Sequence, residues 1–263
     1  MICHAQIGTS LRGGGRTALT TLRSDPPLTL MPTPDGVYVV GSAAGPLNGD
    51  RLALTINVAA GTELTVHTVA ASLAWPGTSP VPSQLRIEAT IGEGATLRWL
   101  PEPLVPVAGS SHRVTAHVDL AADSLAIWRE EIVLGRHNEE PGNLSSRLDV
   151  VLEDAAAVRQ ELSVGPDAHG AVGPAVTGGR RAIGMTTVAG DRAPAGAPAW
   201  SVAGNDFDAA LLTLQRGGMQ VSAAARSAPA LRRALDAGLD HIFTMHAPNV
   251  GADERSSHVG INF

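Results

Sequence analysis

The feature that most constrains the fold of this 263-residue chain is a repeated pair of apolar strands. Four stretches in which apolar and other residues alternate begin at Leu52, Leu85, Val114 and Leu148, at intervals of 33, 29 and 34 residues. Such alternation indicates strands with one buried face, and self-similarity at this period indicates stacked supersecondary units. Because one hairpin cannot bury its apolar face alone, stacking of several units would bury a continuous core.

Each unit also has a turn and a second apolar strand. Nine residues after each start, at or just beyond an expected turn, lie Gly61, Gly94, Asp123 and Ala157. The second strands are expected at 64–70, 97–100, 125–134 and 158–164. Hairpins at such intervals also occur in all-β folds that are not stacked. The period favours stacking, so we expect a mainly β, layered, β-helix-like single domain of stacked β-hairpins, with a few helices near the C-terminus.

The residues before the repeat predict a loose start. Three consecutive glycines, Gly13 to Gly15, cost backbone entropy, so residues 1–16 are expected to form a flexible N-terminus. Short strands are expected at 17–22 and 37–40, joined by a proline-rich connector. The domain is therefore expected to span residues 17–240, followed by a flexible C-terminal tail at 241–263.

After the repeat, a further strand is expected at 182–188. Residues 209–214 and 219–225 flank Gly217-Gly218, which predicts a hairpin. A helix over 206–214 is the alternative, because its apolar residues also fit one helical face.

The pattern from Ser227 onward predicts a helix. Ser227 is a suitable N-cap, and Pro229 lies in the first turn. Leu231 and Leu235 would face inward, and Gly238 is the expected end of the helix.

Composition excludes several classes of function. The net charge of −6, without arginine clusters interleaved with aromatic residues, argues against nucleic-acid partners. A single cysteine, Cys3, excludes an intramolecular disulfide. The sequence shows no secretion signal and no apolar run of about 18 residues, so we expect a cytoplasmic protein with no membrane span.

Motifs of common enzymes are missing from the sequence. It contains no G-x-S-x-G, no H-E-x-x-H and no phosphate-binding G-x-x-x-x-G-K-[ST]. His112 and His117 lie five residues apart in an expected strand, so they should point to opposite faces. We expect no catalytic residues and no tightly bound cofactor.

Acidic residues form the strongest candidate site. Glu130-Glu131 lie near the end of an expected strand, Glu139-Glu140 follow the turn at Gly135-Arg136, and Glu102 stands between two prolines. Acidic groups beside an arginine usually form a solvated rim of ion pairs. The alternative is a surface or channel that hands on a divalent cation such as nickel, because carboxylates and imidazoles suit that metal and transient passage needs few ligands.

With these residues in view, the chain resembles the urease accessory protein family UreD, also called UreH. The turn Gly45 to Asp50 resembles the family's glycine-rich turn, although it has one glycine fewer. Several other stretches resemble family elements in order and spacing: Thr68-Val69-Ala70-Ala71, Trp99-Leu100-Pro101-Glu102, Glu130 to Arg136 and Leu231 to Leu235. The resemblance covers roughly residues 17 to 238, and Val69 stands where the family usually has glutamine.

The resemblance implies a flattened stack of strands that acts as a non-enzymatic assembly factor. Its expected partners are apo-urease and the accessory proteins UreF and UreG, the latter a GTPase. The assembly would deliver nickel to the urease active site, with at most transient nickel on this chain. The candidate partner-binding or metal-conduit residues are Gly49, Asp50, Glu102, Glu130, Glu131, Gly135, Arg136, Glu139 and Glu140.

Two other functions stay open at this point. One is a polysaccharide-acting enzyme on a β-helix, and the other is a β-rich interaction module without metal. The scarcity of tyrosine and tryptophan argues against the enzyme, because sugars usually stack on aromatic faces. A complex with a GTPase would separate the assembly factor from both.

Overall fold

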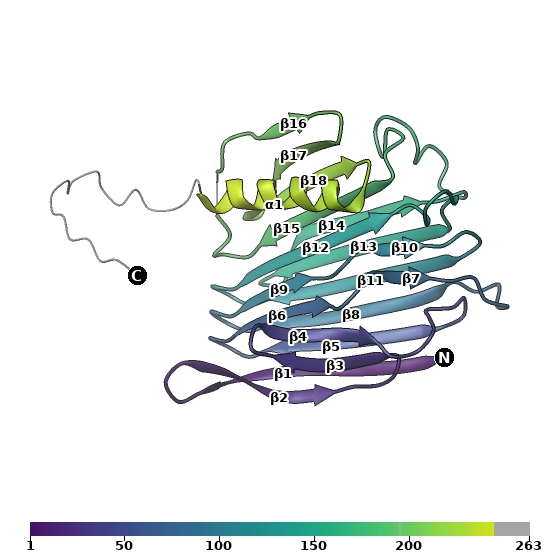
Figure 1. Ribbon diagram of the computed structural model, residues 1–263. Coiled ribbons are helices and arrows are strands. Elements are labelled where there is room, and N and C mark those ends of the chain that lie inside the picture. Colours follow the sequence, from purple (N-terminus) through teal and green to yellow (C-terminus); the bar gives the residue numbers. More distant parts are fainter. Residues whose placement is uncertain (195, 245–263) are drawn as a thin grey trace, which may run out of the picture.

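Two facing β-sheets make up most of the computed structural model, which describes residues 1–194 and 196–244 (Figure 1). Sheet A contains β1 (Ile2–Arg12), β2 (Arg16–Arg23), β5 (Arg51–Val58), β8 (Ser83–Ile91), β11 (Ser111–Leu120), β13 (Asn143–Leu152) and β14 (Ala155–Val164). Sheet B contains β3 (Leu28–Thr33), β4 (Gly36–Gly41), β6 (Glu63–Thr68), β7 (Ser72–Ala74), β9 (Thr96–Leu100), β10 (Leu104–Pro106), β12 (Leu125–Val133), β15 (Ala182–Ala189), β16 (Ser201–Ala203), β17 (Phe207–Thr213) and β18 (Gly218–Ala225). One helix of the described residues, α1 (Ala228–Thr244), packs on sheet B.

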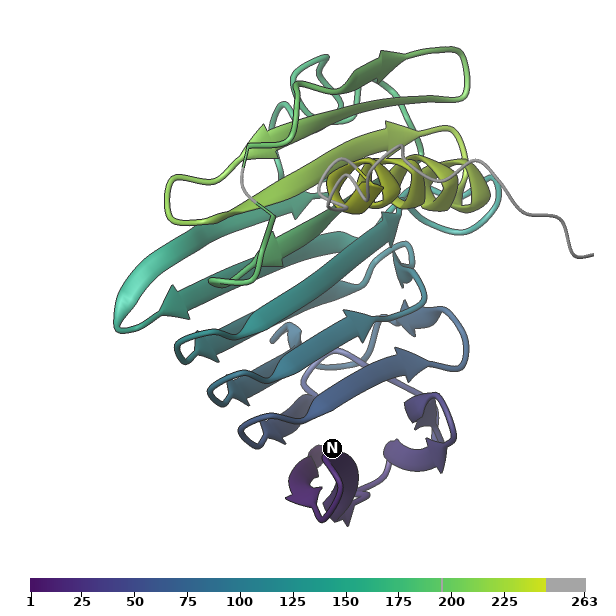
Figure 2. The same cartoon turned by 90° about the vertical axis from the view of Figure 1, so that its left-hand side faces the viewer.

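The order of strands shows how the chain is wound. Sheet A runs β14-β13-β11-β8-β5-β1-β2, and sheet B runs β16-β17-β18-β15-β12-β9-β6-β4-β3, with β7 and β10 paired beside this path. The repeated strands β5, β8, β11 and β13 are parallel neighbours, as are β6, β9 and β12. The chain therefore alternates between the sheets and advances by one strand per turn, which Figure 2 shows as stacked coils.

This winding confirms the predicted stack and corrects one detail of it. Leu52 lies opposite Leu85, and Leu85 lies opposite Val114, as the repeat predicts. The two strands of a unit do not pair as a hairpin, because they lie in different sheets. Their turns bond to the next unit instead: the Gly61 N–H donates to the Glu93 carbonyl at 2.8 Å. Gly61 (φ 67°) thus occupies a predicted turn position, with the left-handed backbone that favours glycine.

The fourth unit ends the stack. Ser146, and not the predicted Leu148, lies opposite Val114, and β14 returns antiparallel to β13 in sheet A. The turn between them places Glu153 and Asp154 at φ values of 46° and 64°. Ala157 therefore lies in β14, three residues beyond Asp154, and this turn keeps both strands in one sheet.

The chain start is a strand, and not the flexible segment expected for residues 1–16. β1 pairs in parallel with β5 from Ile2 opposite Arg51 to Gly8 opposite Asn57. Its alternate residues Cys3, Ala5 and Ile7 are buried in the core, and this burial offsets the entropy lost on ordering. Sheet A therefore begins before residue 17. At the other end residues 241–244 complete α1, and the rest of the expected tail lies outside the described residues.

The later elements match most of the sequence pattern. β15 covers the strand expected at 182–188, and β17 and β18 form the predicted hairpin, which excludes the helix considered for 206–214. The helix α1 follows Ser227, whose hydroxyl accepts a hydrogen bond from the Ala230 N–H at 3.4 Å. Leu231 and Leu235 are fully buried, as expected.

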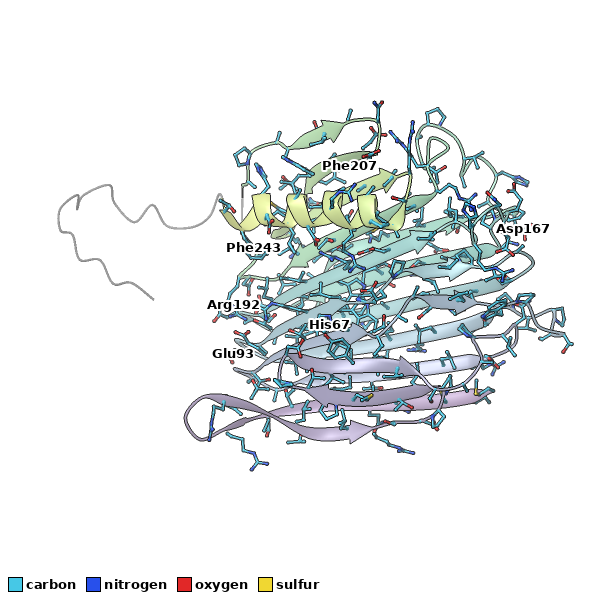
Figure 3. The ribbon with its side chains drawn as sticks, viewed as in Figure 1. His67, Glu93, Asp167, Arg192, Phe207 and Phe243 are labelled. Atoms are coloured by element: carbon cyan, nitrogen blue, oxygen red, sulfur yellow. The ribbon has the colours of Figure 1, made fainter. Side chains whose placement is uncertain are left out.

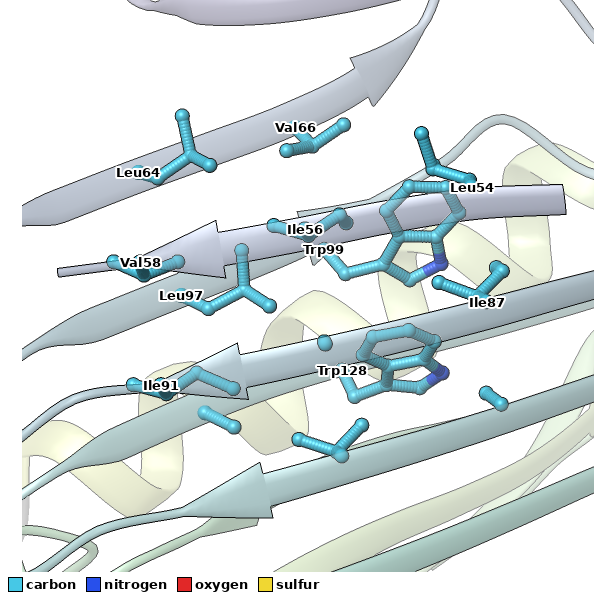
Figure 4. Packing of buried hydrophobic residues seen from close by; sticks show 14 of the residues in the cluster. Leu54, Ile56, Val58, Leu64, Val66, Ile87, Ile91, Leu97, Trp99 and Trp128 are labelled. Atoms are coloured by element: carbon cyan, nitrogen blue, oxygen red, sulfur yellow. The ribbon is translucent and has the colours of Figure 1, made fainter. Parts of the chain in front are cut away.

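The core has two principal layers. The larger layer fills the space between the sheets with aliphatic side chains and two tryptophans (Figure 4). The smaller layer lies between sheet B and α1. Figure 3 places Glu93 on the side of the stack with the tight turns and Asp167 on the opposite side, with the longer loops.

Gly238 does not end α1, which continues to Thr244. It packs against Val221 of β18, where a Cβ atom would come within 2.5 Å of the valine Cγ1. We expect Gly238→Ala to destabilise the protein by about 1–3 kcal/mol through this overlap, despite the better helix propensity of alanine. Urea denaturation measures the change.

Two further variants make this test specific. Gly238→Ala combined with Val221→Ala should recover part of the loss, since the overlap is then relieved. Gly41→Ala is the control, because nothing lies within 4 Å of a Cβ atom there. A single Gly238→Ala variant as stable as the unaltered protein would contradict the close-packing role.

Candidate functional site

A gap in sheet B leads into the space between the sheets. β9 pairs with β12 as far as Trp128, and β10 pairs with β12 only at Ile132. Residues 129–131 of β12 therefore have no strand partner on that side. We call this break, bordered by residues 129–131 and 101–103, the window.

The sequence explains why the ladder stops here. Pro101 and Pro103 have no N–H group, so they cannot donate hydrogen bonds to β12. The Glu102 N–H between them donates to the Thr68 hydroxyl at 2.8 Å. The adjacent coil has a similar break, because residues 69–71 separate β6 from β7. The stretches Thr68 to Ala71 and Trp99 to Glu102, noted in the sequence, both border the cavity behind the window.

The cavity has a volume of about 400 Å³. Its wall on sheet A includes the first positions of the repeat, Leu52, Leu85 and Val114, whose side chains share a face with the buried core residues. Its wall on sheet B includes Trp99 and Trp128, whose stacked rings lie 5.3 Å apart (Figure 4). The repeat and the cavity are thus built from the same residues.

Glu130 and Glu131 point to opposite faces of sheet B, because neighbouring residues of a strand alternate. Glu130 faces the cavity and accepts hydrogen bonds from the Ser146 hydroxyl and, at 3.4 Å, from the Gln160 amide. Glu131 lies beneath α1, is only 3% exposed and accepts a hydrogen bond from Arg232. The predicted pair is therefore two separate sites.

The two carboxyl groups also differ in their electrostatic surroundings. Burial raises the pKa of Glu130, and the hydrogen bonds from Ser146 and Gln160 oppose this only in part. Burial also raises the pKa of Glu131, where Arg232 and Arg129 oppose it. Glu131 has cationic partners, whereas the hydrogen-bond partners of Glu130 are neutral.

An ion-pair network fixes α1 over the window. Arg232 of α1 reaches Glu131 and, at 3.2 and 3.3 Å, both carboxylate oxygens of Glu102. Arg129 donates to Asp236 of α1 at 2.5 Å and lies 3.8 Å from Glu131. Three carboxylates and two guanidinium groups therefore link β12, the 101–103 segment and the helix.

The turn containing Gly49 and Asp50 lies on the side of the stack that carries the longer loops. The buried Asp50 carboxylate binds the Met1 amino group at 2.6 Å and accepts a hydrogen bond from the Leu47 N–H at 2.8 Å. Gly49 has a φ of 93°, which a side chain would strain. Asp50 thus closes its own turn and does not reach the window carboxylates.

The loop after β12 holds Gly135, Arg136, Glu139 and Glu140. Arg136 makes two side-chain hydrogen bonds to Glu139, at 2.9 and 2.8 Å, and lies 5.0 Å above the Trp75 ring. The hydrogen bonds from Arg136 lower the pKa of Glu139 to about 2. A Cβ atom on Gly135 would come within 2.7 Å of the Glu139 carbonyl oxygen, so glycine is needed here. Glu140 is exposed beside this pair.

Trp75 connects these two predicted groups. The backbone N–H of Trp75 donates a hydrogen bond to the Pro46 carbonyl at 2.8 Å, and its backbone carbonyl accepts one from the Asn48 N–H at 3.3 Å. The turn at 45–50 and the loop at 135–140 therefore belong to one loop surface on this side of the stack. Glu102, Glu130 and Glu131 lie apart from it, at the window.

Sequence reasoning missed the residues that organise the window. Arg129 and Arg232 are 103 positions apart, and nothing in the sequence shows that both reach Glu131. The contact of Ser146 with Glu130 was not predicted, because the fourth repeat was expected to start at Leu148, two residues after the residue that lies opposite Val114. Strand alternation was the one available signal that Glu130 and Glu131 face different ways.

The described residues place no three potential ligands from histidine, cysteine, aspartate and glutamate around one point. His112 and His117 do point to opposite faces: His112 is buried against Ser83, and His117 contacts Asp119 on the outer face of sheet A at 3.2 Å. In the described part of the chain, no helix has the length and apolar character needed to cross a membrane.

Comparison with known proteins gives a consistent family assignment. The family model described as UreD urease accessory protein matches residues 3–252. The urease accessory protein UreD of a Parafrankia species is 38% identical over 260 residues, which cover 89% of this chain and 86% of that protein. The UreD of Streptomyces avermitilis is 38% identical over 247 residues, or 90% and 96% of the two chains. The UreD 3 of Streptomyces griseus is 43% identical over 194 residues, or 70% and 76%.

Burial raises the pKa of both Glu130 and Glu131, but only Glu131 has cationic partners, so the same substitution should act differently at the two positions. A raised pKa means that the folded state binds more protons than the unfolded state above the ordinary value of 4.5. Stability contributed by Glu130 therefore falls as pH rises through the folded pKa. Glu130→Gln removes this loss, so the variant should gain stability relative to the unaltered protein between about pH 5 and about pH 8.

Glu131→Gln is the matched change on the outer face. It leaves Arg232 and Arg129 without their buried carboxylate, so we expect a loss of about 3 kcal/mol near pH 8. Urea denaturation of both variants at the two pH values is the measurement. Equal losses at Glu130 and Glu131 near pH 8 would show that the two groups are not electrostatically distinct.

Proposed function

Because the chain belongs to the UreD family of urease accessory proteins, we propose that it is a cytoplasmic urease maturation chaperone. In this proposal it binds apo-urease together with UreF-like and UreG-like partners and supports nickel insertion into the urease active site. The family is one of accessory proteins rather than enzymes, so the function rests on binding.

The observation that carries the nickel part of this proposal is the pair Glu102 and Glu131 at the window. Carboxylates suit nickel as transient ligands. Arg232 neutralises both groups, so a cation that enters must displace this guanidinium rather than settle in a preformed cage. Because Arg232 competes with the cation for these carboxylates, we expect the cation to bind only transiently, as an ion in transit to urease would.

The partner part of the proposal concerns the loop surface around Trp75. This surface brings together the turn with Gly49 and Asp50 and the loop with Gly135, Arg136, Glu139 and Glu140. Its ion pairs and hydrogen bonds hold the backbone in one shape, and a rigid surface loses little entropy on binding. We propose it as a contact surface for urease or an accessory partner.

The test is urease activity and nickel content in cells that carry the urease genes with and without this gene. We expect abundant but inactive, nickel-poor urease without it, and recovery when the gene is returned. Urease that loads normally without the gene would contradict the chaperone function.

A matched pair of variants tests the window separately. Glu102→Gln removes a partly exposed carboxylate at the window, and Glu93→Gln makes the same change at an exposed turn residue outside both the window and the loop surface. We expect Glu102→Gln to lower the nickel content of urease several-fold and Glu93→Gln to have little effect. Immunoblots confirm equal amounts of each variant. Full nickel loading by Glu102→Gln would remove the window from the proposal and leave the chaperone role standing.

A further inference from the structure

The outer face of sheet A is an exposed and strongly charged surface. The one helix of the described residues, α1, packs on strands of sheet B, so no helix covers this face (Figure 1). Along β8, β11 and β13 the inward residues are mostly buried in the core, and the outward residues between them are polar or charged for the most part. Contacts made by this face would therefore be mainly ionic, with little burial of apolar surface.

Four neighbouring strands of this face each carry one outward arginine and one outward carboxylate, and we call this set the charged face. The pairs are Arg86 and Glu88 on β8, Arg113 and Asp119 on β11, Arg147 and Asp149 on β13, and Arg159 and Glu161 on β14. The pairs on β8 and β13 bind within their own strand, on β13 at 2.8 Å. Arg113 is exposed and has no ion-pair or hydrogen-bond partner among the described residues, so its charge is available to another molecule.

These charges are antisymmetric about one line across the sheet. The strand register places Ile87, Ala116, Leu148 and Gln160 side by side, and this row is the line. On β8, β13 and β14 the two charged residues flank the line directly, and on β11 they lie three residues from it on either side. Every arginine on one side is thus matched by a carboxylate at the same distance on the other side.

This antisymmetry makes the charged face complementary to a second copy of itself. If two copies stack face to face about a two-fold axis that runs across the strands along this line, each strand lies antiparallel to its own counterpart. Arg113 of one copy then faces Asp119 of the other, and the pairs on β8, β13 and β14 are opposed in the same way. A two-fold axis along the strands would instead place arginines opposite arginines, so the charges select one orientation.

The size of the face sets the strength of such a contact. Four strands about 4.8 Å apart, each with four outward positions about 6.6 Å apart, give a footprint of roughly 500 Å² per copy, or about 1,000 Å² in total. This area is at the lower limit for a specific interface, and sheets stacked about 10 Å apart leave room for long side chains and water. We therefore expect a weak, salt-sensitive dimer rather than a permanent one.

We propose that the charged face of sheet A binds a second copy of this chain, with each strand antiparallel to its counterpart and Arg113 opposite Asp119. The inference goes beyond the proposed function and does not rest on it. The window and α1 lie on the sheet B side, so this dimer leaves both uncovered.

Sedimentation equilibrium of the full chain at two salt concentrations is the first test. The net charge of −6 repels two copies at long range, but at about 0.1 M NaCl the Debye length of about 10 Å screens most of this repulsion. We expect a monomer–dimer equilibrium there, and a Kd at least about tenfold higher at about 1 M NaCl, where the direct ion pairs are screened as well. A chain that stays monomeric at the lower salt would assign the face to a different partner and overturn the proposal, as would a dimer that strengthens with salt.

Charge reversal tests the pairing of the two copies. Arg113→Asp and Asp119→Arg, each alone, turn two attractive contacts of the dimer into repulsive ones, so each should raise the Kd at least about tenfold. The combined variant restores opposite charges and should dimerise within about threefold of the unaltered chain. Arg226→Asp makes the same change at an exposed position that follows β18 of sheet B, and this control should leave the Kd unchanged.

A mixture of the two single variants gives a further test that needs no combined variant. Each variant should be monomeric where the unaltered chain dimerises, yet the two should associate with each other, because positions 113 and 119 then carry opposite charges at both contacts. Both variants stay net negative, so attraction between their overall charges does not explain such association. Circular dichroism confirms that the exposed substitutions leave the chains folded. Folded variants that do not associate in the mixture, or that dimerise alone as well as the unaltered chain does, would contradict the proposal.

Discussion

The structure depends on where the backbone of each unit finds its hydrogen bonds. After each of the first three turns the chain crosses to the opposite sheet, so a strand pairs with its counterpart in the next unit and not with its own partner. No unit can satisfy its backbone groups alone, and each unit aligns the next. The apolar face of every unit then meets the same row of the facing sheet, which produces a continuous core.

The candidate site lies where the hydrogen-bond ladder of sheet B is interrupted. Two prolines prevent residues 101–103 from pairing with β12, so the sheet opens and residues 129–131 border both the interior and the surface beneath α1. The alternation of side chains then divides the chemistry: Glu130 lies on the uncharged, inner side and Glu131 on the charged, outer side. A wholly paired sheet B would have no such entrance to the cavity.

Much of the scaffold could be predicted because its causes are local. The alternation at Leu52, Leu85 and Val114 specifies strands, and their period specifies the stack. The failures arise from contacts distant in sequence. The start of the chain is ordered by pairing with β5, Gly238 is selected by Val221 on another strand, and the fourth repeat is shifted because β14 folds back. The window could be predicted only in part, because the sequence shows the two prolines but does not show that Arg232 contacts Glu131.

The identity between the repeat and the cavity wall has an evolutionary consequence. Leu52, Leu85 and Val114 are successive rungs of one ladder, so the length of the chamber is counted in whole strands of about 4.8 Å each. Duplication or loss of one unit would change the chamber by a full rung while leaving the pairing of its neighbours intact. Its capacity can therefore evolve in discrete steps through changes in coil number, without redesign of the wall.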